Sequence, residues 1–361
     1  MTDGNDLISF IASMSGEGNL RVEENLGSGF VRLRVSEAER RQAKHDIQHV
    51  EDIVVEMLRN ARDAGAQNIY VATYKEEGVR TLLFLDDGAG VPQDMQERIF
   101  DARVTSKLES MKMDRWGVHG RGMALFSIRQ NTTTSEVVTS GAGLGSSFRV
   151  VVDTSELSER ADQSSWPQTS KDDDGALVCV KGPHNIARCA CEFACEELHG
   201  CDVYLGSPTE IAATLFARSA RTVDATKLLF IDSEDQLPVV DRLACAADAQ
   251  DFMRIAATLG IEISERTAHR ILAGTITPLR SVASRLLREK STPTAPAEFD
   301  LSRDRRGLKI AQEDLAAFSR SLEREFSDLA SRYYLTLMRD PTIRVTRDKI
   351  TVTFDIGKDE T

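Results

Sequence analysis

The sequence has little of what marks a membrane or secreted protein. Its apolar runs are short, and the run from Ile53 to Leu58 is broken by Glu56, far below the ~20 residues that span a bilayer. The first ten residues, MTDGNDLISF, contain no basic segment followed by an apolar one, so they do not resemble a secretory signal. We therefore expect a cytoplasmic protein.

Cysteine is absent from the first 178 residues of the chain. This distribution differs from the evenly spaced framework that holds small secreted domains together, so we expect thiols rather than disulfides. The six cysteines are Cys179, Cys189, Cys191, Cys195, Cys201 and Cys245.

Positive charge is also in deficit, with 45 Lys and Arg against 57 Asp and Glu and a formal net charge of −12. This total opposes a general attraction to nucleic acid, although it leaves room for a local basic face. The 41% hydrophobic and 28% charged residues are ordinary for a globular protein, and 361 residues predict two or three domains.

The hydrophobic pattern predicts an α+β fold. A long helix is expected from Ser36 to Gly65, with Ser36 as N-cap, Glu39 completing a capping box and Gly65 ending the helix. An antiparallel hairpin is expected at 68–74 and 79–87. Further strands are predicted at 135–140 and 146–152.

Beyond residue 155 the pattern changes. A polar tract at 155–174 predicts an exposed connection, and mixed α/β elements follow it. Residues 247–290 are expected to be helix-rich, 291–299 to form a linker, and the chain to end in a long helix and a β-hairpin. We expect three regions, whose bounds are 1–155, 156–240 and 241–361.

A first group of polar residues lies on the helix that ends at Gly65. Glu56 and Asn60 are four residues apart, so they share a helix face, and Asp63 and Ala64 continue it. Their neighbours are apolar, and a carboxylate in such company is costly unless it has a partner or a task.

A second group, DDGAGV, follows the strand at 79–87. Its glycines Gly88 and Gly90 allow tight turns and let a flat ring approach the backbone, with Val91 beside them. Asp86 is placed to accept a hydrogen bond from an exocyclic amine.

A third group precedes a helix in GVHGRGMAL, residues 117–125. Free backbone N–H groups and the helix dipole favour an anion at such a position. Upstream, Thr105, Ser106 and Lys107 offer two hydroxyls and a cation for phosphate oxygens. Residues 101–122 show no clear period and predict a mobile flap.

Together these segments resemble the GHKL superfamily of ATPases, which contains type II topoisomerases, heat-shock-90 chaperones, sensor histidine kinases and MutL proteins. The order EMLRNARDAGA, DDGAGV, VTSKL and GRGMALFSI is most similar to MutL-type sequences and covers about residues 50–130. The resemblance implies a Bergerat-type α/β sandwich, in which a sheet is covered by helices.

The resemblance also implies roles for individual residues. Glu56 would be the general base that activates water, Asn60 the Mg²⁺ ligand, and Asp86 the residue that reads the adenine amine. The residues implied to contact the nucleotide are Asp63, Ala64, Gly88, Gly90, Val91, Thr105, Ser106, Lys107, Gly120, Arg121, Gly122, Met123, Ala124 and Leu125.

The sequence departs from the MutL pattern at two positions, where Asp87 replaces Asn and Met123 replaces Glu. The family's last motif, Gly-Thr before a strand, has two candidates: the segment containing Ser146, which keeps a hydroxyl, and residues 175–178. We prefer Ser146. Lys181 and Lys227 are both candidates for the lysine that reaches the γ-phosphate in MutL relatives.

Two weaker signals lie in the second half. Cysteine and histidine concentrate in residues 184–201, but the spacing lacks the Cys-x₂-Cys element of structural zinc sites, which favours core packing. Residues 252–274 resemble a helix-turn-helix turning at Leu259 and Gly260, and residues 265–310 hold ten Arg or Lys against five Asp or Glu.

These observations favour an Mg²⁺-dependent ATPase whose slow hydrolysis drives a conformational or dimerisation switch. The alternative is a module that binds DNA or protein through residues 247–361 under nucleotide control, without significant turnover. A histidine kinase ranks lower, because no phosphoacceptor helical hairpin precedes the ATP motifs, and His45 and His49 lie on the helix leading into Glu56.

Overall fold

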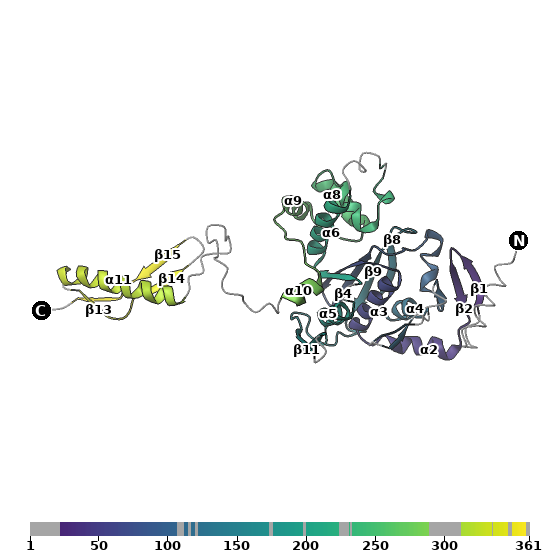
Figure 1. The fold of residues 1–361 in the computed structure, drawn as a ribbon, viewed down its shortest axis with the longest axis horizontal. Helices are drawn as coiled ribbons and strands as arrows, with labels where there is room; N and C mark the ends of the chain where they lie inside the picture. The colour runs from purple at the N-terminus through teal and green to yellow at the C-terminus, as the bar shows by residue number, and fades with distance from the viewer. Residues whose placement is uncertain are drawn as a thin grey trace. The chain divides into compact units, whose positions relative to one another are not determined.

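A computed structural model describes residues 22–106, 112–114, 117–119, 122–172, 176–197, 200–223, 231, 233–288, 312–333, 335–345 and 349–358 (Figure 1). The chain divides into two compact units, residues 1–291 and 292–361, and each is described by itself. None of the described helices is long and apolar enough to cross a membrane.

A five-stranded mixed sheet organises the first unit. Its order is β12-β3-β4-β9-β8, with β12 parallel to β3 and the other neighbours antiparallel. The predicted hairpin is present as β3 and β4, and the predicted strands near 135 and 146 are β8 and β9. The strands span Asn68–Glu76 (β3), Val79–Asp86 (β4), Thr134–Ser140 (β8), Ser146–Asp153 (β9) and Asp202–Gly206 (β12).

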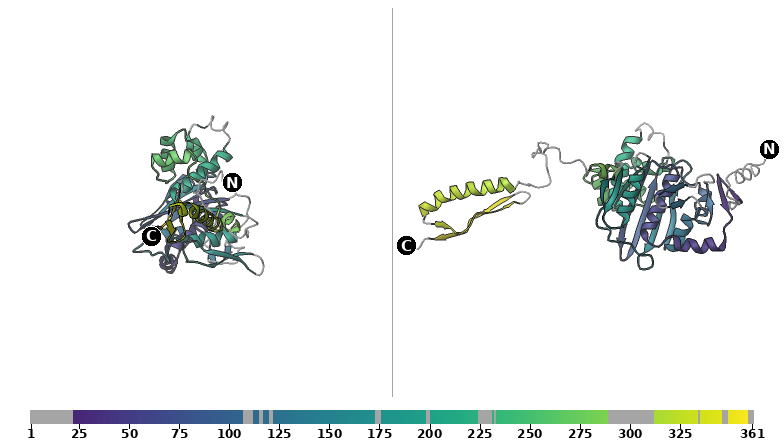
Figure 2. Two further views of the ribbon diagram at one scale, coloured as in Figure 1. Left: turned by 90° about the vertical axis from the view of Figure 1, so that its left-hand side faces the viewer. Right: turned by 60° about the horizontal axis from the view of Figure 1, so that its bottom comes forward.

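Helices cover both faces of this sheet, and each face has its own apolar core (Figures 1 and 2). One core joins Val71, Phe84 and Val150 to α3, α4, α5 and α10, while the other joins Tyr70 and Leu85 to α6, η4, α8 and α9. The helices span Val50–Asp63 (α3), Ala124–Asn131 (α4), Ile186–Glu196 (α5), Pro208–Thr222 (α6), Val239–Cys245 (η4), Ala249–Thr258 (α8), Glu265–Leu272 (α9) and Val282–Arg288 (α10). The expected sandwich of a sheet covered by helices is therefore confirmed.

The single helix predicted from Ser36 to Gly65 is two helices. Helix α2, Glu37–Asp46, begins with the predicted capping box of Ser36 and Glu39. Gly65, with φ of +78°, follows the C-cap Ala64 of α3, where the terminating glycine was predicted. The chain breaks between them because Asp52 accepts hydrogen bonds from the backbone N–H groups of Gln48 and His49 and so starts a new helix.

The compact units do not divide at residues 155 and 240. Strand β12 completes a sheet that begins at residue 68, and the polar tract after 155 is bound to α3, where Glu51 accepts hydrogen bonds from the Arg160 backbone and the Gln163 side chain. Parallel pairing over such a sequence distance joins the two regions into one unit. The predicted linker at 291–299 lies outside the described residues.

Smaller sheets lie beside the main one. Strands β1, β2 and β5 form a three-stranded sheet, while β6 with β7 and β10 with β11 form two-stranded ones. Two short 3₁₀ turns, Gln93–Met95 (η1) and Arg98–Phe100 (η2), follow β4, and Glu234–Gln236 (η3) precedes η4. The strands span Val22–Gly27 (β1), Phe30–Leu33 (β2), Val104–Thr105 (β5), Lys112–Asp114 (β6), Gly117–His119 (β7), Gln168–Lys171 (β10) and Leu177–Lys181 (β11).

The second unit contains the predicted long helix, α11, over Gln312–Tyr333. Strands β13 (Leu335–Leu337) and β16 (Ile356–Lys358) pair with each other, as do β14 (Thr342–Val345) and β15 (Ile350–Thr353). The last pair is the predicted terminal hairpin, whose turn lies outside the described residues.

Candidate functional site

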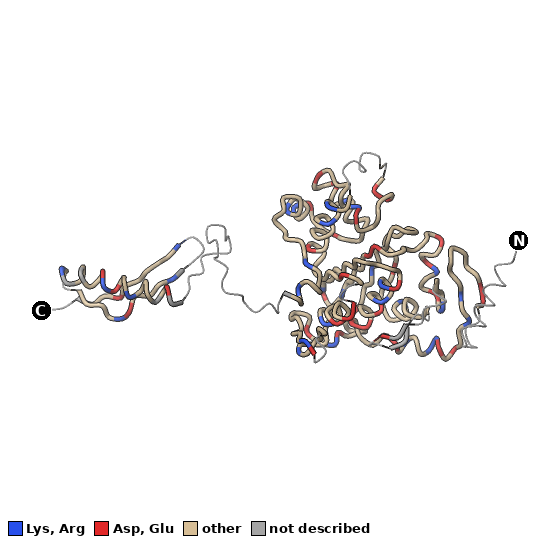
Figure 3. The backbone as a smooth tube through the Cα atoms, viewed as in Figure 1, with Lys and Arg blue, Asp and Glu red and all other residues tan. Residues whose placement is uncertain are grey.

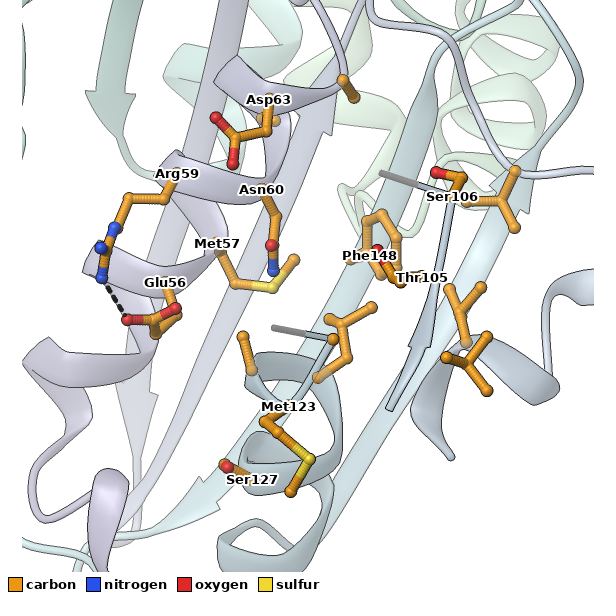
Figure 4. Close-up of a pocket in the computed structure, with 18 of the residues that line it drawn as sticks. Glu56, Met57, Arg59, Asn60, Asp63, Thr105, Ser106, Met123, Ser127 and Phe148 are labelled. Carbon is orange, nitrogen blue, oxygen red and sulfur yellow. Dashed lines mark hydrogen bonds and ion pairs between the residues drawn. The ribbon is translucent and has the colours of Figure 1, made fainter. Parts of the chain in front are cut away.

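A cavity of about 600 Å³ lies between α3, the ends of β4 and β9, and the start of α4. In Figure 4 the α3 side chains Glu56, Asn60 and Asp63 occupy one side, and Thr105, Ser106 and Phe148 the other. Its size falls within the range of small-molecule sites. Of the residues named from the sequence, those lining it are Glu56, Asn60, Asp63, Ala64, Asp86, Gly90, Val91, Thr105, Ser106, Gly122, Met123, Ala124, Leu125 and Ser146.

Asn60 is positioned by a helix that is otherwise largely buried. Ile53, Leu58 and other apolar residues of α3 pack into the core and fix the direction of the helix face that carries Asn60. The Asn60 amide Nδ2 and the Ser127 Oγ are buried with no hydrogen-bond partner among the described residues. Buried polar atoms are almost always paired, so this side of the cavity has unused hydrogen-bonding capacity.

Glu56 is bound to an arginine one turn further along the same helix. The Arg59 Nη1 lies 2.7 Å from the Glu56 Oε1, and a quarter of the Glu56 side chain remains exposed. Burial raises the pKa of Glu56 above its ordinary value, Arg59 opposes that rise, and Asp114 and Asp46 add to it. Such a carboxylate is a better proton acceptor than an exposed one.

The turn after β4 is shaped by close backbone contacts. Gly90 has φ of +68°, and a Cβ there would lie 2.0 Å from the Gly141 carbonyl oxygen. A Cβ on Gly145 would lie 2.1 Å from the Asp86 carbonyl oxygen. Only glycine fits at either position. Gly88 does not line the cavity but holds Asp86, because its N–H donates to the Asp86 Oδ1 at 2.8 Å.

Two adjacent aspartates at this turn have different surroundings. Asp86 is buried and lines the cavity. Asp87 faces the opposite way, and its carboxylate accepts hydrogen bonds from the backbone N–H groups of Gln67 and Asn68 and from the Asn68 side chain. Asp87 stands where MutL sequences usually have Asn, and here it connects the start of β3 to the end of β4.

The opposite wall of the cavity is built from β5 and α4. The Arg103 N–H donates to the Gly122 carbonyl at 2.8 Å, and Gly122 has φ of +68° with no room for a Cβ beside the Val104 carbonyl. Helix α4 begins at Ala124, so backbone N–H groups of its first turn face the cavity without helical partners. Lys107, Gly120 and Arg121 lie outside the described residues.

The two candidates for the last motif lie in different places. Ser146 pairs with Asp86 across β4 and β9 and lines the cavity. Ala176 and Leu177 lie at the β10–β11 sheet, and neither lines the cavity. Lys181 ends β11 and does not line the cavity either, and Lys227 lies outside the described residues.

Several cavity residues were not predicted from the sequence. Phe30 of β2 and Glu39, Gln42 and Asp46 of α2 line the cavity from elements before α3. Glu39 is ion-paired with Arg103, which links α2 to the segment before β5. The only signal for these residues was the amphipathic pattern of α2, which does not reveal what its polar face meets.

Comparisons with known proteins agree with this geometry. Residues 47–173 match the family described as histidine kinase-, DNA gyrase B- and HSP90-like ATPase. The likeness to this family is confined to residues 47–173. The DNA mismatch repair protein MutL of Thermodesulfovibrio yellowstonii is 37% identical over 89 residues, 24% of this chain and 16% of that protein. MutL of Thermus thermophilus is 37% identical over 81 residues, 22% of this chain and 14% of that protein.

These matches cover only part of the chain. The chain spans about a sixth of the length of the MutL proteins it matches. Among solved structures, the catalytic domain of histidine kinase ThkA has a TM-score of 0.21 and 12% identity, covering 34% of this chain and 70% of that one.

Beyond the residues that match this family, the cysteine cluster behaves as packing. All six cysteines are thiols rather than disulfides, and Cys191 and Cys201 are buried. Burial raises the pKa of the Cys189 thiol to about 12, which keeps it protonated. The described residues contain no group of three His, Cys, Asp or Glu side chains suited to a metal ion.

The predicted helix pair at 252–274 is present as α8 and α9. Gly260 turns the chain with φ of +83°, and Ala268 and Ile271 bury one face of α9. Arg266 and Arg270 are exposed residues of α9. Figure 3 shows Lys and Arg in blue along this part of the chain.

Proposed function

We propose that the chain binds ATP with Mg²⁺ and hydrolyses it slowly, and that the nucleotide acts as a conformational switch. The observation that carries the proposal is one cavity lined by the side chains of Glu56, Asn60 and Asp86. This combination supplies a proton acceptor, a metal ligand and a buried carboxylate facing one bound molecule.

Asp86 and the glycine turn would hold the adenine. Gly88 already donates to one Asp86 oxygen, so the carboxylate is oriented before a ligand binds. Gly90 and Gly145 bring backbone close to this carboxylate without side chains, which suits a flat ring. An exocyclic amine would donate to Asp86, and a guanine carbonyl at the same place would be repelled.

The α4 end of the cavity would hold the phosphates. Backbone N–H groups at the start of α4 and the hydroxyls of Thr105 and Ser106 are the donors that phosphate oxygens prefer. Asn60 would hold Mg²⁺ together with the phosphates and water, as is usual for this ion. When bound, the ion would neutralise charge that develops on the phosphates.

Glu56 would accept the proton of the attacking water. Its pKa is raised by burial, which brings it closer to the value that suits a base near neutral pH. The remaining demands of phosphoryl transfer are positioning and electrostatic stabilisation rather than covalent catalysis. The cavity walls described above serve those demands.

The switch would act through the segment from Asp101 to Gly122, which joins the two walls of the cavity. Its described part is tied to α2 and β2 through Arg103, which pairs with Glu39 and accepts a hydrogen bond from the Leu33 N–H. Binding of nucleotide at Thr105 and Ser106 would therefore change the positions of α2 and β2 through Arg103. We propose a nucleotide-dependent homodimer as the readout, with DNA or protein partners contacting residues 247–361.

The proposal is tested by measuring ATP binding by calorimetry and hydrolysis in a single turnover with Mg²⁺. Wild type should bind and hydrolyse ATP slowly, and Glu56→Ala should bind ATP but lose roughly 10²–10⁴-fold in rate. If Glu56→Ala hydrolyses ATP at the wild-type rate, Glu56 is not the general base. Binding without any wild-type turnover would favour a nucleotide-gated binding module.

A further inference from the structure

Arg59 holds a position between two carboxylates. Its Nη1 lies 2.7 Å from the Glu56 Oε1, and its Nε lies 3.0 Å from the Asp114 Oδ2 of β6. The side chains of Arg59 and Asp114 are only 4% and 5% exposed. Arginine keeps its charge when buried, so this is a fixed cation held against Glu56 from within the same helix.

We propose that Arg59 is a positioning residue for the hydrolytic step: it orients Glu56 and keeps it ionised, and Asp114 braces Arg59 in that role. This inference rests on the proposed function, in which Glu56 is the base. It adds a residue that lines the cavity but acts on hydrolysis through the Glu56 carboxylate.

The geometry gives Arg59 two effects on Glu56. An ion pair through Oε1 fixes the plane of the carboxylate and leaves Oε2 to face the cavity, where water would bind. Among the described residues, the charged groups with the largest effect on Glu56 are Arg59 on α3, Asp114 on β6 and Asp46 on α2. Both acids disfavour the ionised form of Glu56, and so does burial, whereas Arg59 favours it.

Asp114 completes the arrangement. An arginine with so little exposure needs its charge balanced, and Asp114 supplies a second carboxylate, which meets Nε rather than Nη1. Without Asp114 the guanidinium would be free to rotate toward other acceptors. The brace therefore preserves the direction in which Arg59 presents Nη1.

Arg62 provides a matched control one turn along α3. It also pairs with Asp114, at 3.2 Å, and with Glu197, at 3.1 Å, and its side chain is 10% exposed. It makes no ion pair with Glu56 among the described contacts. Replacing Arg62 removes a comparable set of ion pairs while leaving the pair with Glu56 in place.

The first experiment measures the ionisation of Glu56 directly in the full chain, without nucleotide. The protein is labelled with side-chain carboxyl ¹³C-glutamate, and the Glu56 signal is assigned by its loss in Glu56→Gln. We expect Arg59→Met to raise the pH midpoint of the Glu56 signal, whereas Arg62→Met lowers the melting temperature but leaves that midpoint unchanged. An equal midpoint in Arg59→Met and wild type would overturn the inference.

The second experiment measures single-turnover hydrolysis across pH. Arg59→Met should be about tenfold slower or worse at pH 7, because a well-positioned general base contributes roughly 10²–10⁴-fold. As the pH is lowered, the hydrolysis rate of Arg59→Met should begin to fall at a higher pH than that of wild type. Its ATP affinity should be little changed. Faster hydrolysis in Arg59→Met would show that Arg59 masks Glu56 and would refute the positioning role.

Two further variants protect the test against misfolding. Arg59→Lys keeps the charge and should retain more activity than Arg59→Met, and Asp114→Asn should shift the Glu56 midpoint less than Arg59→Met. If wild type binds ATP but never hydrolyses it, the proposed function fails at the hydrolysis step. The carboxyl titration still decides in that case whether Arg59 controls the charge of Glu56.

Discussion

Two walls of the same cavity are built on different physical principles. The turn wall, formed by residues 86–91 and 141–146, is shaped by backbone passing so close to backbone that only glycine fits. The helix wall, formed by Glu56, Arg59 and Asn60 of α3, is shaped by buried charge and by an amide that has no partner among the described residues. The first wall fixes shape, and the second sets chemistry.

The difference predicts how each wall responds to substitution. On the turn wall a single added methyl group should disturb folding and binding together, because it would collide with backbone atoms that cannot move away. On the helix wall the same volume can be kept while charge changes, so folding and chemistry should separate. Each prediction below tests one side of that contrast.

The largest effect is expected at Gly90. Gly90→Ala places a Cβ against the Gly141 carbonyl and forces a left-handed residue, costing roughly 2–5 kcal/mol of unfolding free energy from overpacking and strain together. Urea unfolding measures the loss. Gly143→Ala is the control, since Gly143 has φ of +74° but no atom within 4 Å of the added Cβ, and it should cost only about 1–2 kcal/mol. Equal losses would show that backbone conformation, rather than close approach, governs the turn wall.

A smaller effect is expected at the two adjacent aspartates. Asp86→Ala removes a buried acceptor and should weaken ATP binding roughly 10- to 150-fold, the value of a hydrogen bond to a charged group. Asp87→Ala instead removes three hydrogen bonds to Gln67 and Asn68, so it should lower stability with ATP affinity changed less than about threefold. Calorimetric titration with ATP, together with thermal unfolding of both variants, separates the two roles. The opposite pattern would place the adenine at Asp87.

Many of the residues of this cavity could be predicted from the sequence because they lie on short, regular segments. Glu56 and Asn60 follow helical spacing on α3, and Asp86 follows a strand that ends in a glycine turn. Local spacing of this kind fixes which side chains share a face. The fold class and the hairpin of β3 and β4 were predicted for the same reason.

The features that could not be predicted from the sequence depend on contacts between segments that are far apart in the chain. The pairing of Arg59 with Asp114 joins residues 55 positions apart, and β12 lies beside β3 although their paired residues, such as Asn68 and Asp202, are 134 positions apart. The break between α2 and α3 depends on where the Asp52 carboxylate points, which hydrophobic spacing does not encode. Sequence patterns report local periodicity, whereas these features are decided by tertiary packing.

The smallest effect should be a gain in stability from changing the base itself. The pKa of Glu56 in the folded protein is raised above its ordinary value of 4.5, so the protonated form is favoured by folding. Its contribution is fully present below pH 4.5 and is lost as pH rises through the folded pKa, which means that ionised Glu56 weakens the fold at neutral pH. Glu56→Gln should therefore raise the melting temperature by about 1–3 °C at pH 7 and leave it unchanged near pH 4.

Thermal unfolding by circular dichroism at both pH values measures this difference. Glu97→Gln is the control, since its side chain is 87% exposed and the exchange should leave the melting temperature unchanged at either pH. A lower melting temperature for Glu56→Gln at pH 7 would mean that the ion pair with Arg59 outweighs the cost of burying the charge. In that case the helix wall, like the turn wall, would be optimised for the fold. A higher one would show that only the helix wall gives up stability to keep a charged base in place.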